Sequence, residues 1–239
     1  MSYIASFCAR LVMIGGFVAV GLLTSAAQAT IFNIPSAETL PAQTFQLEGE
    51  FTSKPVRFRD GGYRTYGYRT VYGLNNKTDV GANFYFSQGA DGPIGEMQFH
   101  AKRMLHRSER RGLAFSAGVL AYFPLRDSLG ARAGALVYVN GSKTLKRAGG
   151  LRLTSGAYHI VRGDRGPDTR TGAMLGVEQP ITERISLLAD WSSGQNRFGY
   201  SGAGVNYQIT PRQYLTGGYS FGNSGRGNNA LSLSYGYTF

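Results

Sequence analysis

The final stretch of the chain alternates strictly between two kinds of side chain. From Asn229 to Phe239 the sequence reads NALSLSYGYTF, and from Leu231 onward leucine, tyrosine or phenylalanine occupies every second position, with serine, glycine or threonine between. A period of two places the two sets on opposite faces of a β-strand. One face is therefore apolar and ends in aromatic rings, and the other is small and polar.

The end of this strand resembles the C-terminal signal of Gram-negative outer-membrane β-barrels. Tyr235, Tyr237 and the terminal Phe239 carry the resemblance. It implies that the barrel-assembly machinery reads the last strand and that the protein resides in the outer membrane of a Gram-negative bacterium. We expect both termini to be periplasmic.

The start of the chain has the features of a secretory signal peptide, which we assign to residues 1–29. Arg10 precedes an apolar run, and Ala27-Gln28-Ala29 supplies the small residues of a cleavage site. The run is shorter than the roughly 20 residues of a spanning helix. Cleavage would remove Cys8, the only cysteine. Export also argues against a nucleic-acid partner, although the formal net charge is +11.

The same alternation recurs along the chain after a short periplasmic lead-in at residues 30–43. About twelve segments of roughly ten residues follow, the length that a tilted strand needs to cross an outer membrane. They cover residues 44–52, 64–73, 78–87, 96–105, 112–123, 131–140, a segment from about 151, 170–179, 184–192, 199–209, 213–221 and 229–239. The pattern predicts an all-β fold, a transmembrane antiparallel up-and-down barrel over residues 44–239, with short loops.

One connection has two possible turns. Asn140-Gly141 is a hairpin signal in its own right, yet residues 146–150 also have the composition of a turn. We expect a single long turn that covers both, with the next strand beginning near Leu151.

Aromatic residues of the predicted strands fall into two bands if odd strands run outward. Such bands are typical of the two interfaces of an outer-membrane barrel. The outer band would hold Phe86, Phe123, Trp191 and Phe221, and the inner band Tyr72, Tyr207, Tyr237 and Phe239.

The face opposite the apolar set would line the lumen, and it carries charges of both signs in near balance. These charges could pair across a narrow lumen or form rings that select solutes in a water-filled pore. The expected lumen residues are Glu48, Glu50, Arg69, Asp79, Glu96, His100, Lys102, Arg132, Arg152, Glu178, Arg184 and Asp190. Because every predicted loop is short, no loop is expected to plug the barrel.

The architecture resembles the twelve-stranded monomeric porins that pass acidic oligosaccharides, in strand count and terminal signal alone. The first functional hypothesis is therefore a narrow passive channel for small solutes or short oligosaccharides, with a small anionic solute among the candidates. The alternative is a closed structural or accessory barrel beside an envelope or polysaccharide-export system. Loop cations at the outer rim could contact lipopolysaccharide phosphates.

An enzyme is the least favoured class. Barrel-type lipid hydrolases use a His-x-Ser pair, and His106-Arg107-Ser108 has this spacing. It is expected in a charged periplasmic turn, however, away from the outer leaflet on which such enzymes act. His100 and His159 have no partner at metal-ligand spacing, so we expect neither metal nor cofactor.

Overall fold

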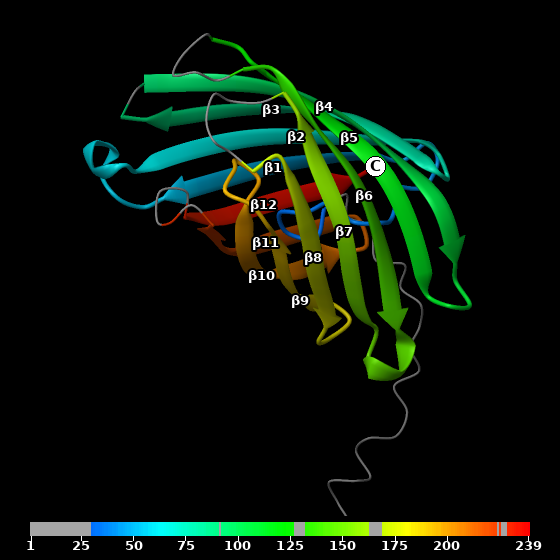
Figure 1. Ribbon diagram of the computed structural model, residues 1–239. Coiled ribbons are helices and arrows are strands. Elements are labelled where there is room, and N and C mark those ends of the chain that lie inside the picture. Colours follow the sequence, from blue (N-terminus) through cyan, green and yellow to red (C-terminus); the bar gives the residue numbers. More distant parts are fainter. Residues whose placement is uncertain (1–29, 91, 127–131, 163–168, 224, 226–228) are drawn as a thin grey trace, which may run out of the picture.

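The computed structural model is a closed barrel of twelve antiparallel strands (Figure 1). It describes residues 30–90, 92–126, 132–162, 169–223, 225 and 229–239. The predicted signal peptide lies outside these residues. No helix in the described part is long and apolar enough to span a membrane.

Each strand pairs with its neighbours in the sequence, and β1 pairs with β12 to close the ring. The strands are β1 (Phe45–Lys54), β2 (Tyr63–Asn75), β3 (Thr78–Gly89), β4 (Gly92–Ser108), β5 (Leu113–Pro124), β6 (Gly134–Leu145), β7 (Leu151–Val161), β8 (Thr171–Pro180), β9 (Ile185–Ser192), β10 (Tyr200–Thr210), β11 (Gln213–Gly222) and β12 (Ala230–Thr238). Two short 3-10 helices, η1 (Phe58–Asp60) and η2 (Lys146–Ala148), lie in connections. The predicted fold class and strand number are confirmed.

The outer surface of the barrel is apolar, as the alternation predicts. In β12, Leu231, Leu233 and Tyr235 are 48%, 47% and 44% exposed, whereas Ala230 on the other face is buried. The aromatic residues of both predicted bands lie near strand ends, and Phe86, Phe123, Trp191, Phe221, Tyr72, Tyr207 and Phe239 are exposed. A surface of this kind suits lipid, because all strand hydrogen bonds are made within the ring.

The connection after β6 differs from the prediction of one long turn. β6 continues through Asn140 and Gly141 to Leu145, and the turn consists of η2 and two glycines, Gly149 and Gly150, with positive φ. Asn140 stays in the strand because its side chain has partners inside the barrel: it accepts from Ser116 Oγ (2.5 Å) and donates to the carbonyl of Pro35 (2.7 Å). The predicted start of β7 at Leu151 is correct.

β4 is the longest strand and also exceeds its prediction. It extends to Ser108, so His106 lies in the strand and not in a turn. The His106 ring is exposed and contacts the Phe115 ring, with 6.4 Å between centroids. No hydrogen bond between His106 and Ser108 is found in the described part of the chain.

Two neighbouring glycines at the seam of the barrel offer a test of the two faces. A Cβ at Gly236, on the inner face of β12, would overlap the Tyr214 ring, whereas a Cβ at Gly49, on the outer face of β1, has nothing within 4 Å. We expect Gly236→Ala to lower the free energy of unfolding by about 1–3 kcal/mol through overpacking.

The matched Gly49→Ala change should be neutral or slightly stabilising, within about 0.5–1 kcal/mol. Urea unfolding in detergent, followed by tryptophan fluorescence of Trp191, measures both. Equal effects of the two changes would contradict the assignment of the faces.

Candidate functional site: the barrel interior

The interior of the barrel is occupied by the residues that precede β1. Ile31, Ile34, Ala37 and Leu40 are each at most 2% exposed, and in Figure 1 this blue segment lies within the ring of strands. Ile31 and Ile34 pack in one cluster with inward-facing side chains of β6 to β9, which are Leu136, Tyr138, Tyr158, Ile160, Met174 and Leu188. We call residues 30–40 the inner segment.

The position of the inner segment differs from the lead-in outside the wall that the sequence predicts. Its apolar residues recur every third position, at residues 31, 34, 37 and 40. A search for the period of two in strands, or for 3.6 in helices, does not detect this spacing. The two prolines, Pro35 and Pro41, also favoured an exposed connection.

Asp190 of β9 holds the start of the inner segment. Its Oδ2 accepts the backbone N–H groups of Phe32 (3.1 Å), Asn33 (2.5 Å) and Ile34 (2.9 Å), and its Oδ1 accepts from Asn33 Nδ2 (3.0 Å). The side chain is buried. Successive backbone N–H groups that converge on one anion form a concave anion site. Asp190 therefore faces the interior, where it binds backbone amides.

Further contacts hold the inner segment along its length. The carbonyl of Pro35 accepts from Asn140, and the N–H of Leu40 donates to Asp79 (3.3 Å). Glu38 pairs with Arg107 at 3.6 Å. The segment thus spans the interior from β9 to the β3–β4 side of the barrel.

Glycines make room for the one large ring of the inner segment. An added Cβ at Gly202, Gly204 or Gly218 would approach the Phe32 ring to 2.7, 3.0 or 2.8 Å. These positions lie on β10 and β11. The inward faces of these two strands therefore form a shallow bed that larger residues would fill.

Three ion pairs lie along the wall and do not cross the lumen. Arg69 contacts Glu48 at 2.8 Å, Lys102 contacts Asp79 at 3.6 Å, and Arg152 contacts Glu178 at 3.4 Å. Each pair joins residues that stand directly opposite on adjacent strands. Because these charges neutralise one another within the wall, the centre of the barrel stays available for the inner segment.

Glu50 is the second acid beside Arg69. The distance from its Oε2 to Arg69 Nη1 is 4.0 Å, and its Oε1 accepts from Thr52 Oγ1 at 3.0 Å. Glu48 also accepts from the Tyr214 hydroxyl at 2.5 Å. One guanidinium thus faces two carboxylates.

One ion pair does cross the lumen, and its cation comes from a loop. Arg197, between β9 and β10, donates to both oxygens of Glu96 at 2.8 and 2.7 Å and lies over the Tyr122 ring, 4.5 Å from its centroid. The next residue, Phe198, packs against the apolar cluster. A loop of ordinary length thus fills part of the barrel, contrary to the expectation that no loop would do so.

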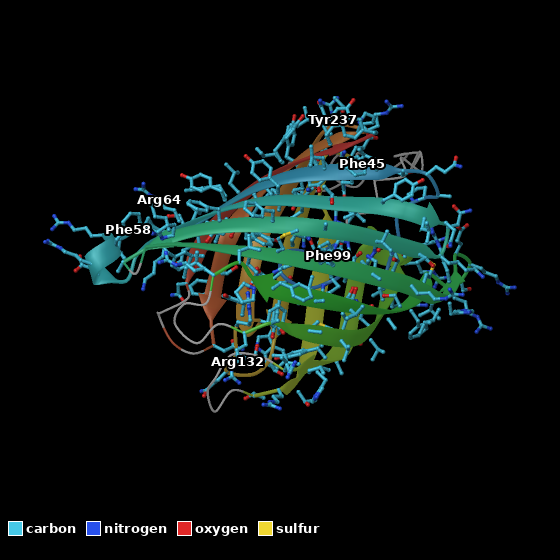
Figure 2. All side chains as sticks on the ribbon, turned by 90° about the horizontal axis from the view of Figure 1, so that it is seen from above. Phe45, Phe58, Arg64, Phe99, Arg132 and Tyr237 are labelled. Carbon is cyan, nitrogen blue, oxygen red and sulfur yellow. The ribbon has the colours of Figure 1, made fainter. Side chains whose placement is uncertain are left out.

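Two of the predicted lumen residues lie elsewhere. Arg132 precedes β6 and is exposed at the rim, as Figure 2 shows, and Arg184 is exposed in the turn before β9. The prediction placed both side chains in the lumen because it continued the alternating pattern beyond the residue at which the strand begins. Arg197 takes no part in a strand pattern, so alternation could not find it.

The remaining predicted lumen residue, His100, faces the interior. Its Nε2 is buried without a hydrogen-bond partner among the described residues. In the same part of the chain, no group of three or more His, Cys, Asp or Glu side chains has the geometry of a metal site.

One cavity between the inner segment and the barrel wall is small. A cavity of about 40 Å³ lies between the inner segment and β1, β2, β11 and β12; its lining includes Thr30, Phe32, Glu50, Arg69 and Thr216. This cavity is far smaller than the ~300 Å³ at which small-molecule sites begin.

The fold is that of the small outer-membrane porins. The KdgM porin, in a structure described as a complex with disordered oligogalacturonate, aligns with a TM-score of 0.59 at 7% identity, over 82% of this chain and 99% of that chain. The NanC porin aligns with 0.57 at 14% identity, over 82% and 98%. An outer-membrane channel from Pseudomonas putida F1 aligns with 0.57 at 15% identity, over 85% and 98%.

Sequence comparisons add nothing to this structural likeness. No protein-family model matches the chain, and no curated protein matches it. At these identities the likeness to solved structures concerns the fold alone.

Asp190 offers a direct test of how the inner segment is held. In Asp190→Asn the amide nitrogen cannot accept, so we expect the hydrogen bonds to residues 32–34 to weaken by about 2 kcal/mol in total. Hydrogen exchange of residues 31–37 should accelerate roughly 30-fold, while the strands keep their protection.

The exposed acid Glu183, in the turn before β9, supplies a control for the loss of one negative charge. Glu183→Gln should leave the exchange of the inner segment unchanged. Unchanged exchange in Asp190→Asn as well would show that the carboxylate does not hold the segment.

Proposed function

We propose that this protein is an outer-membrane channel for small solutes or short oligosaccharides, and that the inner segment occupies its passage. One observation carries the proposal: the wall neutralises its own charges through pairs on adjacent strands, and a separate terminal segment fills the centre. A barrel that encloses an extended peptide leaves, once that peptide moves, a path wide enough for a chain of similar width. The likeness to porins supports this function.

The surrounding membrane and machinery follow from the same proposal. The apolar outer face would contact lipid, the C-terminus and the start of β1 would lie at the periplasmic end, and the barrel-assembly machinery would read Tyr235, Tyr237 and Phe239. Basic residues of the β1–β2 connection, where Figure 2 shows Phe58 at one end of the barrel, would then meet lipopolysaccharide phosphates. Arg64 lies over the Phe58 ring, 5.4 Å from its centroid. We propose no enzymatic activity.

A second function is favoured by the filling of the interior. The inner segment and the Arg197 loop both occupy the interior, and the cavity beside the inner segment is small, as in a closed structural or accessory barrel. The two functions differ in one property, which is whether the inner segment can leave the lumen of the folded protein.

Deletion of residues 30–40 tests the channel directly. The deletion removes no strand residue, so the barrel should still form and show heat-modifiable migration on gels. We expect the single-channel conductance in planar bilayers to rise several-fold over the full mature chain, because the enclosed volume becomes water-filled.

A length-matched variant serves as the control, with Ile31, Ile34 and Leu40 each replaced by serine. It should also conduct, because it loses the apolar burial that holds the segment in place. A folded but silent deletion variant would exclude the channel and favour the structural function.

The charge of the wall predicts the ion preference of the open state. Among the described residues of the wall and its Arg197 loop, Asp190 and Glu50 have no cation of their own, whereas the other acids each contact one. We therefore expect the deletion variant to favour cations, contrary to the anionic solute considered from the sequence.

The reversal potential under a salt gradient measures this preference. Asp190→Asn in the deletion variant should shift it toward zero, since one unpaired negative charge is removed. A preference for anions would contradict this charge inventory.

A further inference from the structure

The predicted cleavage after Ala29 would create a new charged group inside the barrel. Thr30 lines the small cavity next to Glu50, and its Oγ1 lies 3.5 Å from both Nη atoms of Arg69. The first residue of the processed chain is thus in the lumen. Its α-amine, which has an ordinary pKa of about 8, would be largely protonated at neutral pH.

The interior has a deficit of positive charge at this place. In the described part of the chain, Glu38, Glu96, Glu178 and Asp79 each contact a cation. Asp190 is stabilised by backbone amides. Glu48 and Glu50 share Arg69, with Glu50 the more distant.

We propose that Glu50, next to Glu48, forms a binding site for a primary ammonium group, and that the ligand is the α-ammonium of Thr30 in the processed chain. The pair of acids, Arg69 and this ammonium together would carry no net charge. A positively charged partner stabilises a carboxylate most when the carboxylate has little access to water. The inference rests on the predicted cleavage after Ala29 and on the proposed function, which it deepens because it identifies what fixes the free end of the inner segment.

The site couples processing to closure of the lumen. In the precursor, the nitrogen of Thr30 belongs to a peptide bond and carries no charge. Cleavage both frees the segment from the signal peptide and creates the charge that Glu50 binds. The segment is then held at its end by Glu50, at residues 32–34 by Asp190, and further along by Asn140 and Asp79.

A labelling experiment measures docking of the inner segment without reference to conductance. The mature chain has no cysteine once Cys8 is removed. Ser36 is 3% exposed, and Ser36→Cys is nearly isosteric. The rate at which a water-soluble maleimide labels this cysteine in the folded barrel reports the fraction of time that the segment is undocked.

Four proteins that all carry Ser36→Cys form a double-mutant cycle. Two of them have Glu50 and two have Glu50→Gln, and within each pair the α-amine of Thr30 is free in one protein and acetylated in the other. The chain is released from a fusion by a protease that leaves Thr30 first. It is acetylated while unfolded near pH 6.5, where the α-amine reacts in preference to lysine. Heat-modifiable migration confirms that each protein refolds.

We expect acetylation to accelerate labelling about fivefold with Glu50 in place, and less than about twofold in the Glu50→Gln protein. Glu178→Gln is the matched control, since Glu178 is a lumen acid paired with Arg152. There, acetylation should still accelerate labelling about fivefold.

An equal effect of acetylation with and without Glu50 would overturn the ammonium site, whatever the conductance data show. Conversely, the coupling could be present in a barrel whose deletion variant is silent. That result would support the ammonium site and contradict the proposed channel function. No effect of acetylation in any background would also refute the site.

Discussion

Closure of the ring between β1 and β12 is the constraint on which the rest of the structure depends. An open edge would leave backbone N–H and C=O groups without partners in an apolar medium. Eight residue pairs from Gln46↔Thr238 to Ser53↔Leu231 complete the ladder. The seam also sets the faces: because Glu48 stands opposite Gly236, the Tyr214 hydroxyl can reach Glu48 past a position without a side chain. The pairing of β1 with β12 that closes the ring therefore also positions the contact between Tyr214 and Glu48 inside the barrel.

A closed ring of twelve strands encloses more space than its own side chains fill, and this protein fills it with a segment from outside the ring. The alternation had left two possibilities, charges that pair across the lumen and charges that form rings in a water-filled pore. Instead, register places opposite charges side by side on neighbouring strands. These charges of the wall are therefore compensated without contacts across the lumen. The Glu96–Arg197 contact, in contrast, spans the interior.

The strands and most lumen residues could be predicted because both depend on a local period of two. Glu48, Arg69 and Asp190 face inward for that reason alone. The same reasoning was wrong for Arg132 and Arg184, which lie beyond strand ends, and for Asn140-Gly141, whose turn propensity is overridden by contacts to Ser116 and Pro35. The inner segment and Arg197 are held by contacts between residues far apart in the sequence. No local pattern encodes such contacts.

The strength of the inner segment's contacts determines how a channel of this kind would behave at rest. Burying an isoleucine or leucine side chain stabilises by roughly 1.5–3 kcal/mol, and Ile31, Ile34 and Leu40 are all buried. This burial and the hydrogen bonds to Asp190, Asn140 and Asp79 oppose the conformational entropy that the segment regains on release. The balance between these two contributions sets the undocked fraction. A solute opens such a barrel only if it binds the emptied lumen more tightly than the filled one. The wall that it would meet includes Asp190, whose carboxylate loses its amide partners when the segment leaves. Opening thus exposes an acid, and solutes with a hydrogen-bond donor or a positive charge at that position would favour the open state.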